Sequence, residues 1–600
     1  MASQRLPVAI VGGGPVGLVS SILLSLLKIP HRVFEQFPGT SIHPKACGLN
    51  QRTVELFRHI GIEDEFKQHR APKEIIGKTG WFTGIGRQDR EILVRDAWGA
   101  GKYAGAYKKF SPCEYSVLPQ IRLEPLLQKR ALELSTDAVQ YSSKVTEVTE
   151  TAEHVALKVQ GRDGTSQEIH ADYVLAADGG RGMAEQLGIG WIGERDILDM
   201  ITVHFKADLS KSARRKDVFI SWLINPTMKG SLGTGYLYHL GPYNRPNRIG
   251  DEYVLATPKL SDDPTQFDTD ATIARVRRSL GIPELDVDIL SLSHWLVNAR
   301  VTDRYRSKGG RVFLVGDACH RVPPWGALGL NTGFGDAQNI VWKLAMAIKS
   351  GNPTEFDKLL DTYEEERQPI ATIVAKNSLK NMRNHAGAMD TALGITPEAS
   401  AEENTISLNA YYDASHPEYK AKRKAVEKAS EQLDHEFNAP GIEIGWFYPS
   451  LDIEEEGKAS RHGGQVRENG DFDFTTYHPS TLPGHNLPHA WLEKDGRTIS
   501  TKDLTRRDKF VLLTHGDQRW HRYQSSLIDI EVINPRNGWK DIDGAWAEVC
   551  DIDASGAILV RPDGVVALRS KCWERETPGK LKAVFEHIFG GPIPKDFPQE

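Results

Sequence analysis

Residues 309–333 combine the residue types that a large polar cofactor requires. An apolar run at 312–315 predicts a buried strand, and Gly316-Asp317 places a carboxylate directly at its end. A loop rich in proline and glycine follows, and a helix is expected to begin near Asn331. Because the first amides of a helix lack partners within the helix, they attract negative charge. We interpret this stretch as the binding site for the ribityl chain and ring of a flavin.

A second cofactor element lies at residues 6–36, which predict a strand, a glycine turn, a helix and a second strand. Gly12 permits the tight turn, Gly14 lets a pyrophosphate approach the backbone, and Gly17 lets helix and strand pack closely. Glu35 ends the second strand and can accept hydrogen bonds from ribose hydroxyls. A glutamate at this place favours a ribose without a 2′-phosphate, as in FAD or NAD, and not NADP.

Two other polar places could contact the same cofactor. Lys45 could neutralise phosphate charge, although a solvated surface lysine is an equally good interpretation. Asp178-Gly179 ends another predicted buried strand, but a pair of this kind is more often a plain turn. Neither place identifies a cofactor by itself.

An aromatic-rich region spans residues 190–300 and alternates like strands. Tyr236 and Tyr238 share one face of a predicted strand, so His239 lies on the other face. Together with Trp222, these side chains could line an apolar pocket or form the core of a sheet. The pattern does not decide between these two interpretations.

Composition excludes several classes of protein. A chain of 600 residues predicts two to four domains, and its net charge of −6 gives no reason to expect nucleic acid or an anionic membrane as partner. The five cysteines are scattered without a C-x-x-C pair, which argues against a structural zinc site, a redox dithiol or a disulfide scaffold and favours a reducing compartment, and no metal is expected. The apolar run at 22–27 is too short to span a bilayer. We therefore expect a cytoplasmic protein.

The remaining elements follow from hydrophobic periodicity. Antiparallel strands are expected at 139–178. Helices are expected at 272–280, 357–378 and 417–436, and the polar segment 396–440 is typical of a connector. The last part predicts a compact unit of strands and one final helix, with strands at 510–513, 528–533 and 558–560 and the helix at 581–588.

Three motifs in this order resemble one family. They are GxGPxG at 12–17, Asp178-Gly179, and Gly316-Asp317 followed by Pro-Pro and Gly-Leu-Asn. The chain resembles the FAD-dependent aromatic hydroxylases typified by para-hydroxybenzoate hydroxylase. It is most similar to the phenol and chlorophenol hydroxylases that carry a C-terminal thioredoxin-like domain, with further likeness at 118–125, 482–492 and 559–564.

This resemblance implies an α/β (α+β) fold of interleaved domains. A discontinuous Rossmann-like FAD-binding domain would cover residues 1–188 and 300–395, with parts of 71–118 facing the substrate domain. A mixed β-sheet substrate domain would cover 189–299. A helical connector at 396–450 would lead to a thioredoxin-like domain at 451–600 that lacks C-x-x-C and therefore serves packing or dimer support. A homodimer is one expected assembly.

The resemblance also implies the chemistry and the site. FAD would be bound non-covalently, NADPH or NADH would reduce it, and molecular oxygen would add to give a flavin C4a-hydroperoxide that attacks a small, electron-rich phenolic ring. Asp317 would bind the ribityl hydroxyls, Gln120 and Lys45 would approach the flavin and pyrophosphate, and Pro324 would lie beside the reactive edge. The full cofactor set is Gly12, Gly14, Pro15, Gly17, Glu35, Gln36, Lys45, Gln120, Asp178, Gly316, Asp317, Pro324, Gly329, Leu330 and Asn331. Catalytic candidates are Pro324, Tyr236 and His239, and the expected substrate pocket comprises Cys47, Trp222, Tyr236 and Tyr238.

Two departures from the family pattern leave alternatives open. Gly182 and Glu185 stand where relatives usually have serine and arginine, so the family's nicotinamide contacts do not carry over to these two positions. Cys47 stands where some relatives have an acid or a histidine, so the sequence names no catalytic base. One alternative is a flavin monooxygenase that epoxidises, dearomatises or oxidatively decarboxylates a polyketide or another secondary metabolite. Another is a flavin-binding protein without turnover.

Overall fold

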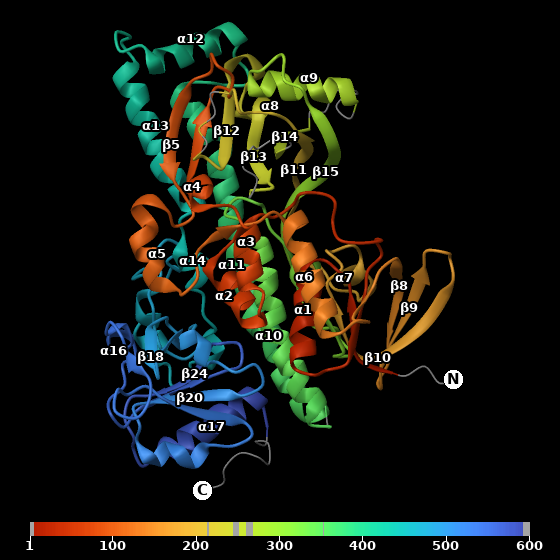
Figure 1. The fold of residues 1–600 in the computed structure, drawn as a ribbon, viewed down its shortest axis with the longest axis vertical. Helices are drawn as coiled ribbons and strands as arrows, with labels where there is room; N and C mark the ends of the chain where they lie inside the picture. The colour runs from red at the N-terminus through yellow and green to blue at the C-terminus, as the bar shows by residue number, and fades with distance from the viewer. Residues whose placement is uncertain are drawn as a thin grey trace.

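The computed structural model describes residues 5–212, 215, 217–243, 251–259, 268–351 and 353–591. Figure 1 shows a sheet with α1 and α10 near the middle of the molecule, a large sheet at the top, and the C-terminal unit at the bottom left. This is the α/β architecture with a second sheet that the sequence predicts.

The seven-stranded sheet has a parallel centre with an antiparallel edge. Its strands, in spatial order, are β7 (Val139–Gln140), β2 (His31–Phe34), β1 (Leu6–Val11), β10 (Ser166–Ala176), β9 (Val155–Gly161) and β8 (Ser143–Glu150), and β16 (Val312–Leu314) pairs with β10. Since β1, β10 and β16 are parallel, their carboxyl ends meet at one edge of the sheet. The glycine turn after β1, the Asp178 turn and the Gly316 loop are therefore neighbours.

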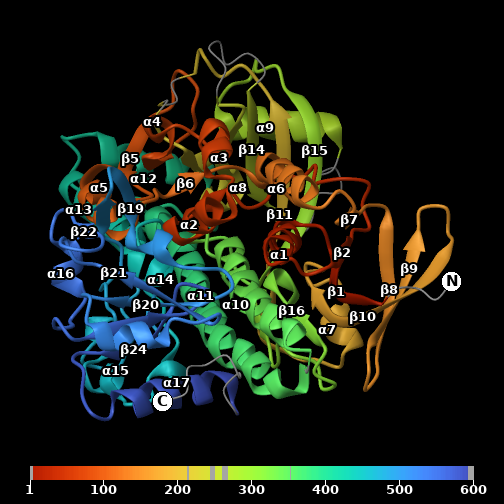
Figure 2. The ribbon, with the colours of Figure 1, turned by 60° about the horizontal axis from the view of Figure 1, so that its bottom comes forward.

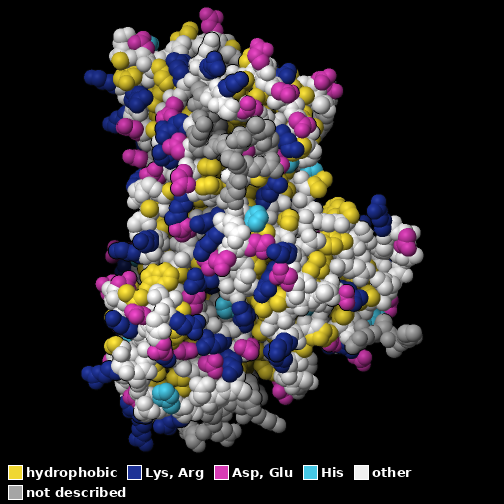
Figure 3. Space-filling view, viewed as in Figure 1, with side chains coloured by type: hydrophobic (Ala, Val, Ile, Leu, Met, Phe, Trp, Pro, Cys, Tyr) yellow, Lys and Arg dark blue, Asp and Glu magenta, His cyan; other side chains and the backbone are white. Residues whose placement is uncertain are grey.

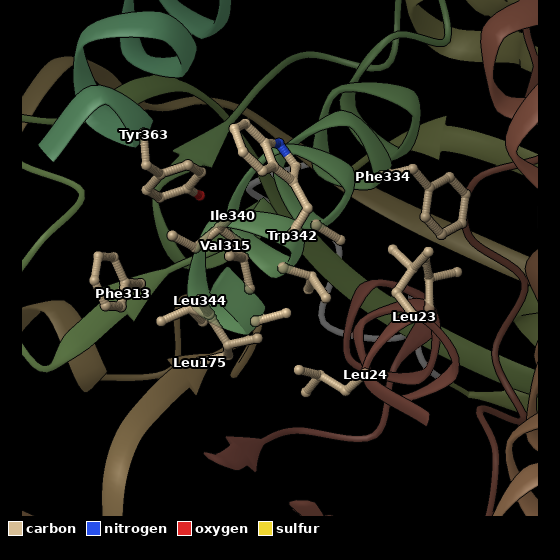
Figure 4. Close-up of a cluster of buried hydrophobic side chains, with 14 of the residues drawn as sticks. Leu23, Leu24, Leu175, Phe313, Val315, Phe334, Ile340, Trp342, Leu344 and Tyr363 are labelled. Atoms are coloured by element: carbon tan, nitrogen blue, oxygen red, sulfur yellow. The ribbon is translucent and has the colours of Figure 1, made fainter. Parts of the chain in front are cut away.

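Buried side chains hold this edge against two helices, α1 (Pro15–Leu26) and α10 (Gly329–Lys349). Figure 4 shows Leu23 and Leu24 of α1 and Ile340 and Leu344 of α10 gathered with Leu175 of β10. Each such side chain contributes about 1.5–3 kcal/mol when fully buried. The packing therefore fixes both helix starts relative to the strand ends.

The second sheet has eight strands and supplies an aromatic face. Its strands, in spatial order, are β17 (His320–Arg321), β15 (Asp288–Thr302), β11 (Trp191–Lys206), β14 (Glu252–Pro258), β13 (Gly235–Gly241), β12 (Ile220–Asn225), β4 (Lys78–Phe82) and β5 (Glu91–Asp96). Two of them, β4 and β5, come from the segment 71–118 that we expected to face this domain. Helix α9 (Thr269–Leu280) packs its Val276 and Leu280 on the other, aliphatic face.

The longest helix, α11 (Asp357–Leu393), continues well beyond the predicted end at residue 378. Figure 2 shows α10 and α11 side by side between the seven-stranded sheet and the C-terminal unit. The last turns of α11 carry Met382, His385 and Met389 to the aromatic face of the second sheet. The extension therefore brings α11, which packs beside α10, to the eight-stranded sheet.

The predicted connector is helical and packs on the same face. It forms α12 (Ala401–Tyr412) and α13 (Tyr419–Leu433), whose Leu408 and Val426 are buried in the aromatic cluster. The hydroxyl of Tyr411 donates to the carbonyl of Ile92, at 2.6 Å. The segment is thus part of the core and not only a link.

The C-terminal unit contains two small sheets and a closing helix. The four-stranded sheet has the order β21 (Ile528–Val532), β20 (Phe510–Thr514), β23 (Ala557–Val560) and β24 (Val566–Ser570), and α17 spans Thr577–Phe589. The three-stranded sheet comprises β19 (Arg497–Ser500), β18 (Trp491–Lys494) and β22 (Lys540–Asp541). All the predicted strands and the final helix of this unit are present, and its thioredoxin-like character stays a prediction.

Short elements connect these parts. The helices are α2 (Gln51–Ile60), α3 (Glu63–His69), α4 (Lys73–Ile76), α5 (Ala104–Phe110), α6 (Gln120–Leu134), α7 (Met183–Gln186), α8 (Ser231–Thr234), α14 (Pro440–Ile444), α15 (Glu456–Ala459) and α16 (Ala545–Val549). A two-stranded ladder joins β3 (Gly48–Leu49) to β6 (Ser116–Val117).

The surface in Figure 3 intersperses acidic and basic side chains, without a large area of one sign on the face shown. Among the described residues, no helix is both long and apolar enough to cross a bilayer.

A buried ionic network fastens the C-terminal unit to α10 and α11. The guanidinium of Arg561 donates to both oxygens of Glu366, at 2.5 and 2.9 Å, and to Asp563 at 2.6 Å. Lys343 also donates to Glu366, at 2.7 Å, and all of these groups are buried. Because these charged groups are removed from water, the desolvation cost of each one is offset only by its ionic partners.

We therefore predict that Arg561→Ala destabilises the holoenzyme by about 3–5 kcal/mol, since it leaves Glu366 and Asp563 short of positive charge. Thermal and urea unfolding measure the loss. The control is Lys129→Ala, which removes an exposed pair with Glu65 and should change little. Equal unfolding of the two variants would show that the network does not fasten the unit.

Candidate active site

The glycine turn after β1 has the three properties expected from the sequence. At Gly12, where φ is +106°, an added Cβ would lie 2.3 Å from the carbonyl oxygen of Ala177, and at Gly17 it would lie 2.0 Å from that of Gly12. At Gly14 an added Cβ meets nothing within 4 Å, so the start of α1 faces open space. Pro15 occupies the first turn of α1. The turn can therefore receive a pyrophosphate at a helix start.

Glu35 lies next to this turn. Its carboxylate accepts hydrogen bonds from the amide of Gly13, at 2.6 Å, and from that of Phe37, at 2.8 Å. A carboxylate has about four lone-pair positions, so two stay available for ribose hydroxyls. Gln36 is exposed beside it.

Asp317 follows β16 in a short 3-10 turn, Gly316–Ala318. Its side chain reaches solvent, and no described residue donates a hydrogen bond to it. Nearby protein atoms nevertheless exclude much of the bulk water, and this raises the pKa of the Asp317 carboxyl, while the charges of Lys45 and Arg321 act in the opposite direction. A carboxylate in this setting gains from a ligand that donates hydroxyl hydrogens.

The start of α10 lies beside this loop. Among the described residues, the amides of Gly329, Leu330 and Asn331 donate to no backbone carbonyl. Pro324 is exposed in the preceding loop, whereas the neighbouring Trp325 is buried. The free amides can stabilise negative charge on a ligand such as the pyrimidine end of a reduced flavin.

The side chain of Asn331 is fully used within the protein. Its oxygen accepts from the amide of Asn50, at 3.0 Å, and from the hydroxyl of Thr53, at 2.6 Å. Its nitrogen donates to the carbonyls of Gly48 and Ala327. Asn331 therefore positions the start of α10 against α2, and only its backbone amide is available to a cofactor.

The structure also shows the surroundings of three other predicted cofactor residues, Asp178, Gln120 and Lys45. Both oxygens of Asp178 accept amides of its own turn, from Gly180, Arg181 and Met183 at 2.8–3.0 Å, which supports the turn interpretation. Gln120 donates to Glu124 at 2.5 Å. Lys45 is exposed and has no ion-pair partner among the described residues. Of the three, Lys45 is the one free to meet phosphate.

The charges that hold the Asp317 loop come from distant segments and are not apparent from the sequence. Asp336 on α10 accepts the amide of Gly316 at 3.1 Å and contacts His320 at 2.6 Å. Arg367 on α11 donates to the other oxygen, at 2.8 Å. Cys319, His320 and Asp336 are close enough to hold a cation, but Arg367 already neutralises the carboxylate. We therefore regard this group as structural.

The aromatic face of the second sheet lies next to the proline loop. Trp222 and Tyr236 are 4.7 Å apart between ring centroids, and Tyr236 stacks on Tyr238 at 6.2 Å. Trp325 belongs to the same cluster, and Cys47 packs against it. The four residues expected in the substrate pocket, Cys47, Trp222, Tyr236 and Tyr238, are therefore brought together.

His239 lies elsewhere, because it points to the opposite face of β13. Its Nε2 is 3.0 Å from Asp251, and its ring packs against Tyr253 at 5.0 Å. This alternation follows from the period of a strand. The structure thus places His239 away from the aromatic face, and this corrects the prediction that His239 is a catalytic candidate.

Glu443 of α14 is a buried carboxyl behind the start of α10. It accepts the hydroxyl of Tyr107 at 3.0 Å and the amide of Ala439 at 3.1 Å, and its carbonyl accepts from Asn50. Burial raises the pKa of Glu443 to about 7. A pocket lined by Asn50, Asn331 and Glu443 adjoins it.

This pKa predicts a pH-dependent stability. The folded protein holds a proton on Glu443 between its ordinary pKa of 4.5 and about 7, whereas the unfolded chain has released it. The stabilising contribution is therefore present below the unfolded pKa and is lost as pH rises through 7, by about 1.4 kcal/mol per pH unit. Glu443→Gln should lack this loss, so its thermal midpoint should rise relative to wild type between pH 5 and pH 8. Glu133→Gln, at an exposed position, is the control, and parallel curves for Glu443→Gln and wild type would contradict the prediction.

The arrangement fits FAD. The pyrophosphate fits the open space at Gly14, and the ribose fits the free lone pairs of Glu35. The ribityl chain fits the unpartnered carboxylate of Asp317, and the flavin ring fits the free amides of α10.

We predict that Asp317→Ala weakens FAD binding about 10- to 100-fold, the effect of losing hydrogen bonds of about 1.5–3 kcal/mol to a charged group. Titration of apoprotein with FAD, followed by flavin fluorescence, measures the dissociation constant. Asp163→Ala in the exposed turn between β9 and β10 is the matched control. An unchanged constant for Asp317→Ala would remove Asp317 from the ribityl site.

Comparison with known families gives two matches. The model of the FAD binding domain family matches residues 5–378, and that of the aromatic-ring hydroxylase C-terminal family matches residues 480–592. These matches cover both of the large sheets and most of the C-terminal unit.

Whole-length relatives agree with these families. The chain is 31% identical over 604 residues to a 2,4-dichlorophenol 6-monooxygenase of Delftia acidovorans, with 97% of each chain covered. It is also 31% identical over 595 residues to a provisionally named polyketide hydroxylase of Streptomyces halstedii, covering 95% of this chain and 94% of the relative. The solved structure of the flavin-dependent monooxygenase PieE, in complex with FAD and substrate, superimposes with a TM-score of 0.87 at 32% identity, covering 98% of this chain and 100% of that one.

Proposed function

Since the chain belongs to the FAD-dependent aromatic-ring hydroxylases, we propose that it hydroxylates a small phenolic ring. It is an FAD-dependent aromatic monooxygenase that consumes NAD(P)H and oxygen. The observation that carries the phenolic assignment is the aromatic cluster of Trp222, Tyr236 and Trp325 directly beside the proline loop of the cofactor site. A bound FAD would take electrons from NAD(P)H and would supply the oxygen-activating chemistry of the hydroxylation.

The protein's own residues bind and orient this cofactor. We propose that Gly12, Gly14, Pro15 and Gly17 receive its pyrophosphate and that Glu35 binds the adenosine ribose. Asp317 holds the ribityl hydroxyls, and the amides of Gly329, Leu330 and Asn331 meet the flavin ring. Remaining contacts of this proposed set come from Gln36, Lys45, Gln120, Asp178, Gly316 and Pro324.

The aromatic cluster excludes water from the reacting ring, which the hydroxylation requires. Burial raises the pKa of the Cys47 thiol to about 12, so this thiol is neutral at physiological pH and cannot serve as the base. Burial also raises the pKa values of Tyr236 and Tyr238. Their hydroxyls therefore stay protonated and can only donate or accept hydrogen bonds.

A second candidate substrate class is a polyketide. It is favoured by the relative from Streptomyces halstedii, which is as similar in sequence as the chlorophenol relative. Epoxidation, oxidative dearomatisation or oxidative decarboxylation would each use the same cofactor site. Mass spectrometry of the product separates these reactions from phenol hydroxylation.

We also propose the domain division given by the sequence, namely 1–188 with 300–395, 189–299, 396–450 and 451–600. A reducing, cytoplasmic location is supported by the five free cysteines. A homodimer stays a prediction, which light scattering of the holoenzyme tests.

We predict that phenol and chlorinated phenols accelerate NAD(P)H oxidation by the purified holoenzyme, because the ring site is coupled to reduction of FAD. Labelled oxygen gas should place one labelled atom in a catechol product. Benzoate, which lacks the activating hydroxyl, is the control. Bound FAD without oxygen transfer to any phenol would overturn the phenolic assignment.

A further inference from the structure

An imidazole lies within the aromatic cluster. His385 is carried there by the extended end of α11, and it is 9% exposed. Its ring centroid is 3.8 Å from that of Trp222, 6.2 Å from Trp81 and 6.3 Å from Trp325. His385 therefore contacts the second sheet and the proline loop of the cofactor site together.

One nitrogen of His385 is fixed and the other is free. Nδ1 lies 2.9 Å from the carboxylate of Glu436, which is 2% exposed. No described residue forms a hydrogen bond with Nε2, and this atom is not fully buried, so it keeps access to solvent. A proton shared between Nδ1 and the carboxylate leaves a lone pair on Nε2. An imidazole ordered in this way can accept a proton from a ligand.

Other charged groups lie near the pair of His385 and Glu436. Arg95 on β5 lies 3.5 Å from Glu436 and 3.1 Å from Asp434. Asp390, one turn further along α11, interacts electrostatically with His385 and accepts the amide and hydroxyl of Ser231. Three carboxyl groups and one guanidinium therefore lie near the imidazole, and burial raises the pKa of one of these carboxyls, Asp390.

We propose that His385 is the catalytic base that ionises the phenolic substrate, with Glu436 as its positioning residue. This rests on the proposed function. The O–H bond of the phenol breaks, a bond from Nε2 to hydrogen forms, and the electron pair stays on the phenolate oxygen and activates the ring. Glu436 stabilises the imidazolium. After hydroxylation the hydroxylated ring carbon loses a proton to water, and the electron pair of that C–H bond restores the aromatic ring. The proton on Nε2 then returns to the phenolic oxygen, and His385 is neutral again.

No residue of the predicted substrate pocket itself can act as the base. Cys47, Tyr236 and Tyr238 are neutral groups with raised pKa values, and His239 lies on the opposite face of its strand. Among the described residues of the aromatic cluster, His385 is the histidine whose ring contacts its tryptophans. A base is needed because phenolate is far more electron-rich than phenol.

The test is the pH profile of kcat/KM for His385→Gln, with phenol and 2,4-dichlorophenol as probes and labelled oxygen to count product. We expect a loss of about 100-fold or more at neutral pH, the usual contribution of a general base. We also expect activity to recover as rising pH ionises the phenol in solution. A structural role would instead lower activity equally at every pH.

Two further variants keep the test decisive. Glu436→Gln preserves the shape of the pair but not its charge, so we expect about a 10-fold loss at neutral pH with unchanged FAD affinity, because a weaker charge-assisted bond raises the energy of the imidazolium. His489→Gln removes another buried histidine, bonded to Ser500 in the C-terminal unit, and should leave the profile unchanged.

The outcomes separate the two proposals. If wild type turns over neither probe, the phenolic function itself fails. If wild type is active, and FAD-loaded His385→Gln or Glu436→Gln gives the wild-type profile or a loss that is equal at all pH values, His385 is not the base. If His385→Gln does not bind FAD, the Glu436→Gln profile decides.

Discussion

The buried carboxylate of Asp336 is the interaction on which the cofactor loop depends. It joins the amide of Gly316, the ring of His320 and the guanidinium of Arg367, and so ties the end of β16 to both long helices. Removing water from a carboxylate is unfavourable unless its partners stay in place, so the loop has little freedom to move. Because Asp317 follows Gly316 directly, its direction is set by a charge that does not itself face the cofactor. The free amides of α10 start from the same helix that carries Asp336.

The parts of the site that the sequence predicts are those fixed by local rules. The glycine turn and Glu35 belong to one continuous unit, in which each residue type follows from a backbone constraint. The face shared by Tyr236 and Tyr238 follows from the two-residue period of a strand, and the same rule already separates His239 from them. The place of Gly316 and Asp317 at the end of a strand follows from the local pattern, whereas the role of Asp317 toward the ribityl chain is implied by the family resemblance and stays a prediction.

What the sequence does not predict depends on contacts between distant segments. His385 and Glu436 are 51 positions apart, and both fall in stretches that look like polar helix surface. Their meeting requires α11 to run beyond its predicted end and the connector to fold back on the sheet. The role of Asn331 is a similar case, since its side chain meets residues 278 to 283 positions away. Periodicity reports which face of a helix is buried, but it does not report against which partner.

The attachment of Arg561 to Glu366 also sets an order of events during synthesis. Glu366 and Lys343 are buried between α10 and α11, and the guanidinium that completes this group lies 195 positions after Glu366 in the chain. Before residue 561 is synthesised, Lys343 already balances the charge of Glu366, but Glu366 lacks its two hydrogen bonds from Arg561. The N-terminal part can therefore form first, as is usual for multidomain chains. Docking of the C-terminal unit is then the later step that covers this ion pair and completes its hydrogen bonds.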